Sequence, residues 1–143
     1  MAMLADDLEA AREFLSIGLE QAPNSTYLYV TRSDLARREE GIQASLEWIA
    51  KGLEKSPDNA VLVLKRAELE LAALDTEAAR RSIQQLQRSK TRREWIDYLD
   101  VRLLMMEGKW LQAAEKLEGV RAELIDNNPH LRPQVYVSLV QCY

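Results

Sequence analysis

Acidic residues that could suggest paired carboxylates for acid–base chemistry stand at two places, Glu39-Glu40 and Asp97 with Asp100. Two carboxyl groups can serve as general acid and general base when they converge on one point and their pKa values differ. No nucleophile and no cluster of metal-ligating residues stands beside either pair in the sequence. We therefore interpret both pairs as solvated helix faces, and we predict a non-enzymatic protein with no catalytic residue, metal site or cofactor.

The single histidine and the single cysteine limit the remaining chemistry. One histidine cannot form a paired-histidine metal motif, and one cysteine allows neither an internal disulfide nor a four-cysteine metal site. His130 stands in a predicted turn, Pro129-His130-Leu131, where we expect a structural or exposed side chain. Cys142 stands on a predicted apolar helix, where we expect it to pack as a small hydrophobic residue.

Length and composition favour a helical domain. The chain has 143 residues, a net charge of -4, and only five glycines and four prolines, too few for the many turns of an all-β fold. A negative net charge without lysine–arginine blocks longer than two argues against nucleic-acid binding. No apolar run approaches the ~20 residues of a membrane span, and the acidic N-terminus is unlike a signal peptide. We predict a cytoplasmic protein with neither a nucleic-acid nor a membrane partner.

Apolar residues at three- and four-residue steps predict helices along the whole chain. The predicted helices cover 4–22, 26–39, 43–55, 60–74, 76–88, 94 to the turn at 107–109, 110–126 and 133–143. Ser25 or Thr26 can cap the second of these helices, and Thr76 the fifth. Thr91 and Glu94 fit a capping box before the sixth. We therefore predict an all-α fold of seven or eight helices.

One 34-residue unit, 26–59, organises the chain. Pro57 stands 34 residues after Pro23, and the triplet Gly-Leu-Glu at 52–54 stands 34 residues after the one at 18–20. Proline ends helices because it lacks the backbone N–H and clashes with the preceding turn. Helix ends repeated at this fixed spacing indicate a helix–turn–helix solenoid.

In this register the chain resembles the tetratricopeptide repeat (TPR) family. The residues that carry the resemblance are Tyr29, Ile49 and Pro57, then Gly108, Ala113 and Leu117, then Tyr136, Leu139-Val140 and Tyr143. The chain departs from the family pattern where Arg32, Arg66 and Asp100 replace a leucine. The third unit also lacks the turn glycine and the closing proline. A pentatricopeptide-like array is the alternative interpretation.

The resemblance implies an α-solenoid of stacked antiparallel helix pairs, wound as a right-handed superhelix whose first helices line a concave groove. Its units would be 1–25 (partial), 26–59, 60–93, 94–132 and 133–143 (partial), cut from a larger repeat protein. It also implies a scaffold that binds a protein or peptide of unknown identity. The groove residues would be Tyr27, Val30, Asp34, Arg37, Leu64, Glu68, Leu71, Trp95, Tyr98, Arg102 and Met105.

Aromatic residues are the expected anchors of this groove, above all Trp95 and Tyr98 on a first helix. For Trp95 the binding and packing interpretations are equally open. Trp48 and Trp110 belong to second helices or their entry, where packing between helices is favoured. A carboxylate clamp of the kind that some TPR domains use for chaperone tails is not expected, because only Lys65 is basic among its five positions.

Charged residues recur at one repeat position as Arg32, Arg66 and Asp100, with the sign reversed in the last copy. Chance is an equal alternative in a chain with 29% charged residues. If the pattern is not chance, adjacent first helices pair their charges, and Arg66 should lie within salt-bridge reach of Asp34 or Asp100. Exposed pairs of this kind are worth only about 0–1 kcal/mol.

The last predicted helix, 133–143, is apolar on two sides. Its apolar residues are Tyr136, Val137, Leu139, Val140, Cys142 and Tyr143. One side can pack on helix 110–126, and an exposed apolar patch on the other tends to be covered, so we expect self-association through this helix. Two further functions stay open: a structural spacer of a larger protein and, less favoured because of the net charge, a nucleic-acid-binding helical repeat.

Overall fold

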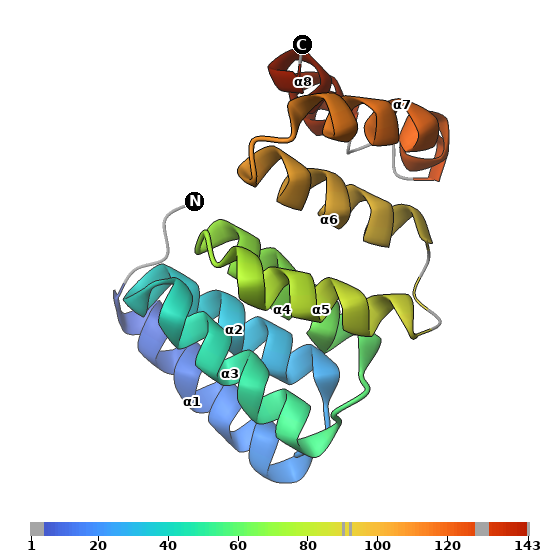
Figure 1. Ribbon diagram of the computed structural model, residues 1–143. Helices are drawn as coiled ribbons and strands as arrows, with labels where there is room; N and C mark the ends of the chain where they lie inside the picture. The colour runs from blue at the N-terminus through green and yellow to red at the C-terminus, as the bar shows by residue number, and fades with distance from the viewer. Residues whose placement is uncertain (1–4, 90, 92, 128–131, 143) are drawn as a thin grey trace. The chain divides into compact units, whose positions relative to one another are not determined.

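The computed structural model describes residues 5–89, 91, 93–127 and 132–142, and the secondary structure in this part of the chain is α-helical, with no strand. Its helices are α1 (Ala5–Gln21), α2 (Thr26–Glu40), α3 (Ile42–Lys55), α4 (Ala60–Ala72), α5 (Thr76–Gln87), α6 (Arg93–Met106), α7 (Trp110–Asn127) and α8 (Arg132–Cys142) (Figure 1). The all-α prediction is confirmed, and each helix begins and ends within two residues of its predicted bounds.

Short polar side chains begin three of these helices. Ser25, one of the two residues predicted to cap α2, is its N-cap, and Asn59 is the N-cap of α4. The prediction for α5 was wrong by one residue: Asp75 is the N-cap, and its carboxylate accepts a hydrogen bond of 3.2 Å from the Ala78 N–H. Thr76 is already the first helical residue, because the carboxylate of Asp75 before it accepts a hydrogen bond from a free N–H group of the first turn.

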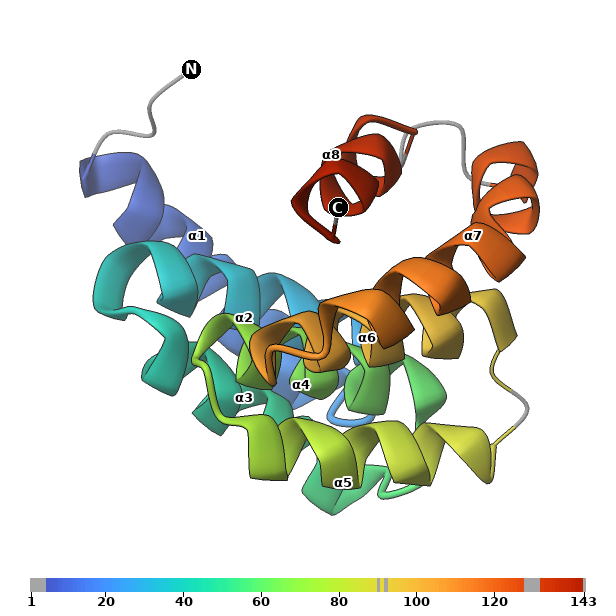
Figure 2. The same cartoon turned by 45° about the horizontal axis from the view of Figure 1, so that its top comes forward.

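The chain divides between Ala73 and Leu74 into two compact units. In the first unit each helix packs against the next, from α1 to α4, and α2 also contacts α4. In the second unit α5 packs against α6, α6 against α7, and α7 against α8 (Figure 2). The boundary lies in the turn between α4 and α5, inside the predicted unit 60–93.

Small residues lie at the contact between α2 and α3. Ser33 and Ser45 are both fully buried, their hydroxyl oxygens lie 2.6 Å apart, and the Ser33 hydroxyl donates to the Ser45 carbonyl oxygen at 3.0 Å. Further along α3, a Cβ on Gly52 would lie 3.0 Å from Tyr29 Cγ, so the glycine lets the tyrosine ring rest on the helix backbone. Helices that touch this closely need residues without bulk at the contact.

The second unit has buried residues at the same register positions. Val101 on α6 and Ala113 on α7 stand two 34-residue periods after Ser33 and Ser45, and both are fully buried. With Leu117 they form the core cluster of this unit. The repeat seen in the sequence is therefore also a repeat of buried positions.

The turns before α5 and α7 each contain a residue with left-handed backbone. Gly108 has φ +76°, and Leu74, one 34-residue period earlier, has φ +61°. Glycine adopts this conformation freely, whereas a residue with a Cβ pays roughly 1–2 kcal/mol. The missing turn glycine of the third unit thus leaves a leucine in the strained position, with 75% of its side chain exposed.

Candidate functional site

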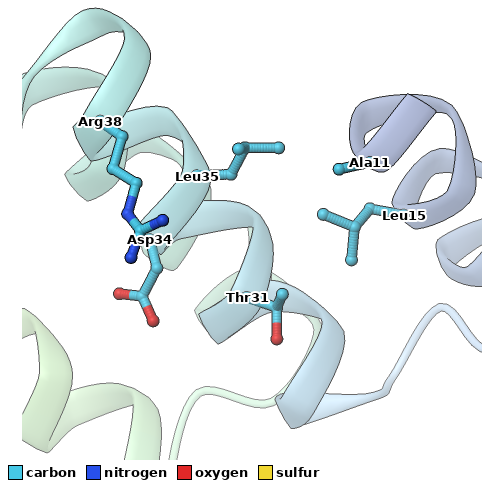
Figure 3. Close-up of a pocket in the computed structure, with 6 residues that line it drawn as sticks. All are labelled: Ala11, Leu15, Thr31, Asp34, Leu35 and Arg38. Carbon is cyan, nitrogen blue, oxygen red and sulfur yellow. The ribbon is translucent and has the colours of Figure 1, made fainter. Parts of the chain in front are cut away.

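A cavity of about 200 Å³ lies between α1 and α2 in the first unit (Figure 3). Its lining residues are Ala11 and Leu15 of α1 and Thr31, Asp34, Leu35 and Arg38 of α2. All six are placed by helical periodicity, since residues three and four apart share one face of a helix. We call this cavity the α1–α2 pocket.

Apolar side chains form the floor of the α1–α2 pocket. Leu15 and Leu35 are only 8% and 6% exposed, and Ala11 is half-buried. Ala11 and Leu15 point from α1 toward Leu35, which comes from α2 to meet them (Figure 3). Ala11 lies one helical turn before Leu15, and its single methyl group leaves space where a longer side chain would fill the gap.

Polar side chains of α2 form the rim. The Thr31 hydroxyl donates a hydrogen bond of 2.8 Å to the Tyr27 carbonyl oxygen, so its oxygen remains an acceptor. The Asp34 carboxylate forms an ion pair with Lys65 of α4 at 2.8 Å, which offsets its charge. Arg38 is exposed and has no ion-pair partner among the residues that the structure describes. The rim therefore carries one unmatched positive charge.

Exposed apolar surface continues from the pocket along α1. Phe14 is 80% exposed and Ile17 is 53% exposed. Phe14 follows Ala11 by three residues, so it is a neighbour of the pocket on the helix surface. Large apolar side chains gathered beside a concave feature mark a surface that can bind another molecule.

The predicted groove residues of the first unit have different environments. Asp34 lines the α1–α2 pocket. Tyr27 is 75% exposed and Arg37 is exposed, while Val30, Leu64 and Glu68 are half-buried. Leu71 is only 1% exposed, so it belongs to the core and offers no surface to a partner.

Three of the four predicted groove residues of the second unit pack against its core. Trp95, Tyr98 and Met105 are partly buried and pack against the cluster of Val101, Ala113 and Leu117. Arg102 is half-buried. Packing within the unit thus takes up part of the surface of Trp95 and Tyr98, the two residues expected to be the best anchors.

The charged residues of the repeat position pair locally. Asp34 pairs with Lys65, the residue before Arg66, and Arg66 Nε lies 4.0 Å from Glu70 Oε1 on its own helix. In the second unit Asp100 pairs with Lys116. The Arg66–Asp100 pair, which would join the two units, stays a prediction.

The other singled-out residues are mostly structural. Trp48 is half-buried between Arg32 and Lys51, in keeping with a packing role, whereas Trp110 is 46% exposed at the start of α7. Cys142 packs against the core cluster of the second unit, as expected, and burial raises the pKa of its thiol. The predicted turn at His130 and the residue Tyr143 lie outside the described residues.

The described residues hold no group of three or more histidine, cysteine, aspartate or glutamate side chains that could bind a metal ion. None of the helices in the described ranges combines the length and the apolar character that crossing a membrane requires. Comparisons of the chain with family models, with curated proteins and with solved structures gave no match. The functional argument therefore rests on the geometry of the molecule.

Of the pocket residues, only Asp34 belongs to the predicted groove. Ala11, Leu15 and Leu35 belong to the apolar stripes that predict the first two helices, and they are buried or half-buried. The signal that could have found the pocket is the small residue Ala11 one turn from a leucine, on the helix that faces Leu35. Arg38 gave no signal, because an exposed arginine in the last turn of a helix is common for electrostatic reasons alone.

Proposed function

We propose that this protein is a non-enzymatic scaffold of the TPR type, and that its first unit binds a segment of a partner protein at the α1–α2 pocket. The 34-residue period, the matching buried positions of the two units and the helix–turn–helix order support the repeat assignment. Each helix pair of such an array needs its neighbours to bury its apolar face. Its exposed side is then available to partners.

The size and lining of the pocket carry the proposal. A volume of about 200 Å³ is smaller than the roughly 300–1,000 Å³ of small-molecule and cofactor sites. It is larger than the roughly 150 Å³ of an apolar cavity that binds benzene. An apolar floor of this size suits one aliphatic or aromatic side chain of a protein partner.

The expected affinity follows from the same surface. Burying one large apolar side chain is worth about 1.5–3 kcal/mol, and contact with Phe14 adds apolar area. Ordering a flexible peptide offsets much of this gain. We therefore expect weak, reversible binding by a single short peptide, strengthened where a partner engages further parts of the surface.

A second contact is proposed for α8. Val137 and Val140 on this helix are 55% and 76% exposed, and they share one face because they are three residues apart. This face suits a second copy of the chain. A structural spacer, the alternative function, would need neither this face nor the pocket.

Peptide display on the immobilised chain tests the proposal, with Ala11→Phe as the second bait. The larger side chain fills the pocket without adding charge, and thermal unfolding verifies that the variant is folded. We expect peptides with large apolar residues to be enriched on the native chain and to bind at least tenfold more weakly to Ala11→Phe. Equal binding to both baits, or no enrichment at all, would contradict a binding role for the pocket and favour the spacer.

A further inference from the structure

We infer that the α1–α2 pocket recognises an extended, acidic peptide segment in which a large apolar residue and an aspartate or glutamate stand two positions apart. This inference rests on the proposed function and adds the chemistry of the partner. The apolar residue enters the pocket, and the carboxylate pairs with Arg38. Three observations carry it: the volume of the pocket, the charges on its rim and the spacing of its residues on α2.

The volume and the apolar floor of the α1–α2 pocket determine which side chain of the peptide can enter it; we call that side chain the anchor. Leu15, Leu35 and Ala11 present aliphatic carbon, and the cavity of about 200 Å³ accommodates a leucine, isoleucine, methionine or phenylalanine side chain. A charged side chain in the same place would lose its hydration without gaining a partner on the floor, which is costly. Phe14, 80% exposed beside Ala11, can cover the outer side of the anchor.

The rim selects the sign of the partner's charge. Asp34 already forms an ion pair with Lys65 at 2.8 Å, and this pair reduces the attraction of its carboxylate for a positively charged group of a partner. Arg38 lines the pocket, is exposed, and has no ion-pair partner among the described residues. Arginine presents a planar set of N–H donors that matches a carboxylate in a two-bond geometry. The neighbouring Arg37 is also exposed but does not line the pocket.

The spacing of Leu35 and Arg38 sets the register of the motif. Residues three apart on a helix have Cβ atoms about 5–6 Å apart. In an extended peptide, side chains two positions apart lie on one side and are separated by roughly 6.6 Å. An apolar side chain over Leu35 therefore places the side chain two positions away over Arg38. A helical partner would instead use residues three or four apart.

Binding of designed peptides to the full chain tests the inference. Fluorescent nonapeptides of serine and glycine carry leucine at one position and glutamate two positions on, in both chain directions. Companion peptides carry glutamine or lysine in place of the glutamate, and a further one places glutamate four positions from the leucine. Fluorescence anisotropy gives each dissociation constant for the native chain and for the variants Arg38→Glu and Arg37→Glu, with far-UV circular dichroism as the folding control.

We expect the leucine–glutamate peptide to bind about fivefold more tightly than its glutamine companion, the range of an exposed ion pair of about 1 kcal/mol. Arg38→Glu should abolish this preference and favour the lysine peptide instead. Arg37→Glu, the matched control, should change the preference less than twofold. The four-residue spacing should bind no better than the glutamine peptide.

Three outcomes overturn the inference and separate it from the proposed function. If Arg38→Glu and Arg37→Glu weaken binding of the glutamate peptide equally, the peptide responds to the overall positive charge of α2 and not to a pair with Arg38. The proposed function then stands without this specificity. If the four-residue spacing binds best, the partner is helical. If none of the designed peptides binds while displayed peptides bind in a way that Ala11→Phe abolishes, the pocket binds another class of segment. If neither the designed peptides nor the displayed peptides bind, the proposed function is contradicted as well.

Discussion

The guanidinium of Arg32 lies 4.5 Å from the centre of the Trp48 ring, and the Lys51 ammonium approaches the same ring to 4.1 Å. Arg32 and Trp48 stand sixteen residues apart on α2 and α3, and Asp100 and Lys116 stand at the same spacing on α6 and α7, where they form an ion pair. The two units thus use different interactions at the same repeat position, a cation–π contact in the first and an ion pair in the second. Arg32 and Asp100 can occupy this partly or fully buried position because each finds a partner on the next helix.

The first prediction concerns Arg32, which is only 8% exposed and has a buried Nη1 without a hydrogen-bond partner. A buried donor without a partner costs about 1–3 kcal/mol, whereas a cation–π contact is worth about 0.5–2 kcal/mol. We expect Arg32→Met to raise the free energy of unfolding by about 1 kcal/mol, as measured by urea denaturation. Arg32→Ala should lower it, because it opens a cavity beside Trp48. Equal destabilisation by both variants would mean that the cation–π contact outweighs the orphaned donor.

The second prediction concerns the hydroxyl pair of Ser33 and Ser45, which are both fully buried. Either single alanine variant removes the hydrogen bond between the hydroxyls and should cost about 1 kcal/mol. The double variant removes both polar groups and keeps the close helix contact, so the midpoint of its urea unfolding should be nearly that of the native chain. A double variant as unstable as the sum of the singles would show that the two hydroxyls do not act as a pair.

The third prediction concerns Leu74, which has φ +61° in the turn before α5. Leu74→Gly should raise the free energy of unfolding by about 1 kcal/mol, because glycine adopts this conformation without strain. The reciprocal variant Gly108→Leu places the same strain at φ +76° and should lower stability by a similar amount. Calorimetric melting temperatures give both effects, and a destabilised Leu74→Gly would show that the leucine side chain contributes contacts that offset its backbone strain.

The helix bounds could be predicted because they depend on local signals. Periodic apolar residues, the prolines at 23 and 57 and short polar caps each act within a few residues. The 34-residue repeat could be predicted from signals of the same kind, the spacing of Pro23 from Pro57 and of the two Gly-Leu-Glu triplets.

The pocket and the buried charge could not be predicted in this way. A cavity depends on how completely two facing helices fill the space between them, and the sequence pattern treats Ala11 and Leu15 alike as inward residues. The burial of Arg32 likewise depends on Trp48, sixteen residues away, which covers its guanidinium. Both properties arise from packing between helices, which periodicity does not encode.

The fourth prediction concerns self-association through α8. Val140 is 76% exposed, and we expect static light scattering of concentrated protein to show a dimer that Val140→Glu shifts toward the monomer, because a charge in an apolar contact is costly. Gln141→Glu, the matched control, adds the same charge to a neighbouring exposed residue of α8. Monomeric native protein, or equal effects of both variants, would contradict a contact centred on Val140.

The last prediction concerns Glu107, whose carboxylate pairs with Arg80 of α5 and with Lys109 at 2.8 Å. The hydrogen bond from Lys109 and the charge of Arg80 lower the pKa of Glu107 below its ordinary value. A carboxyl group with a lowered pKa in the folded state stabilises the fold above its unfolded pKa, and this stabilisation is lost as the pH falls through the folded pKa. Glu107→Gln should therefore be less stable than the native chain at pH 7 and equally stable once Glu107 is protonated.

The size of the Glu107 effect should be below about 1 kcal/mol, because the Arg80 and Lys109 side chains are 43% and 49% exposed and water screens the pair. Added salt should shrink the difference at pH 7, since exposed ion pairs weaken as the ionic strength rises. Urea unfolding from pH 7 to pH 3 provides the measurement. Glu115→Gln, which removes an exposed α7 carboxylate without an ion-pair partner among the described residues, is the control. A stability difference that is constant with pH would show that Glu107 contributes through packing and not through its charge.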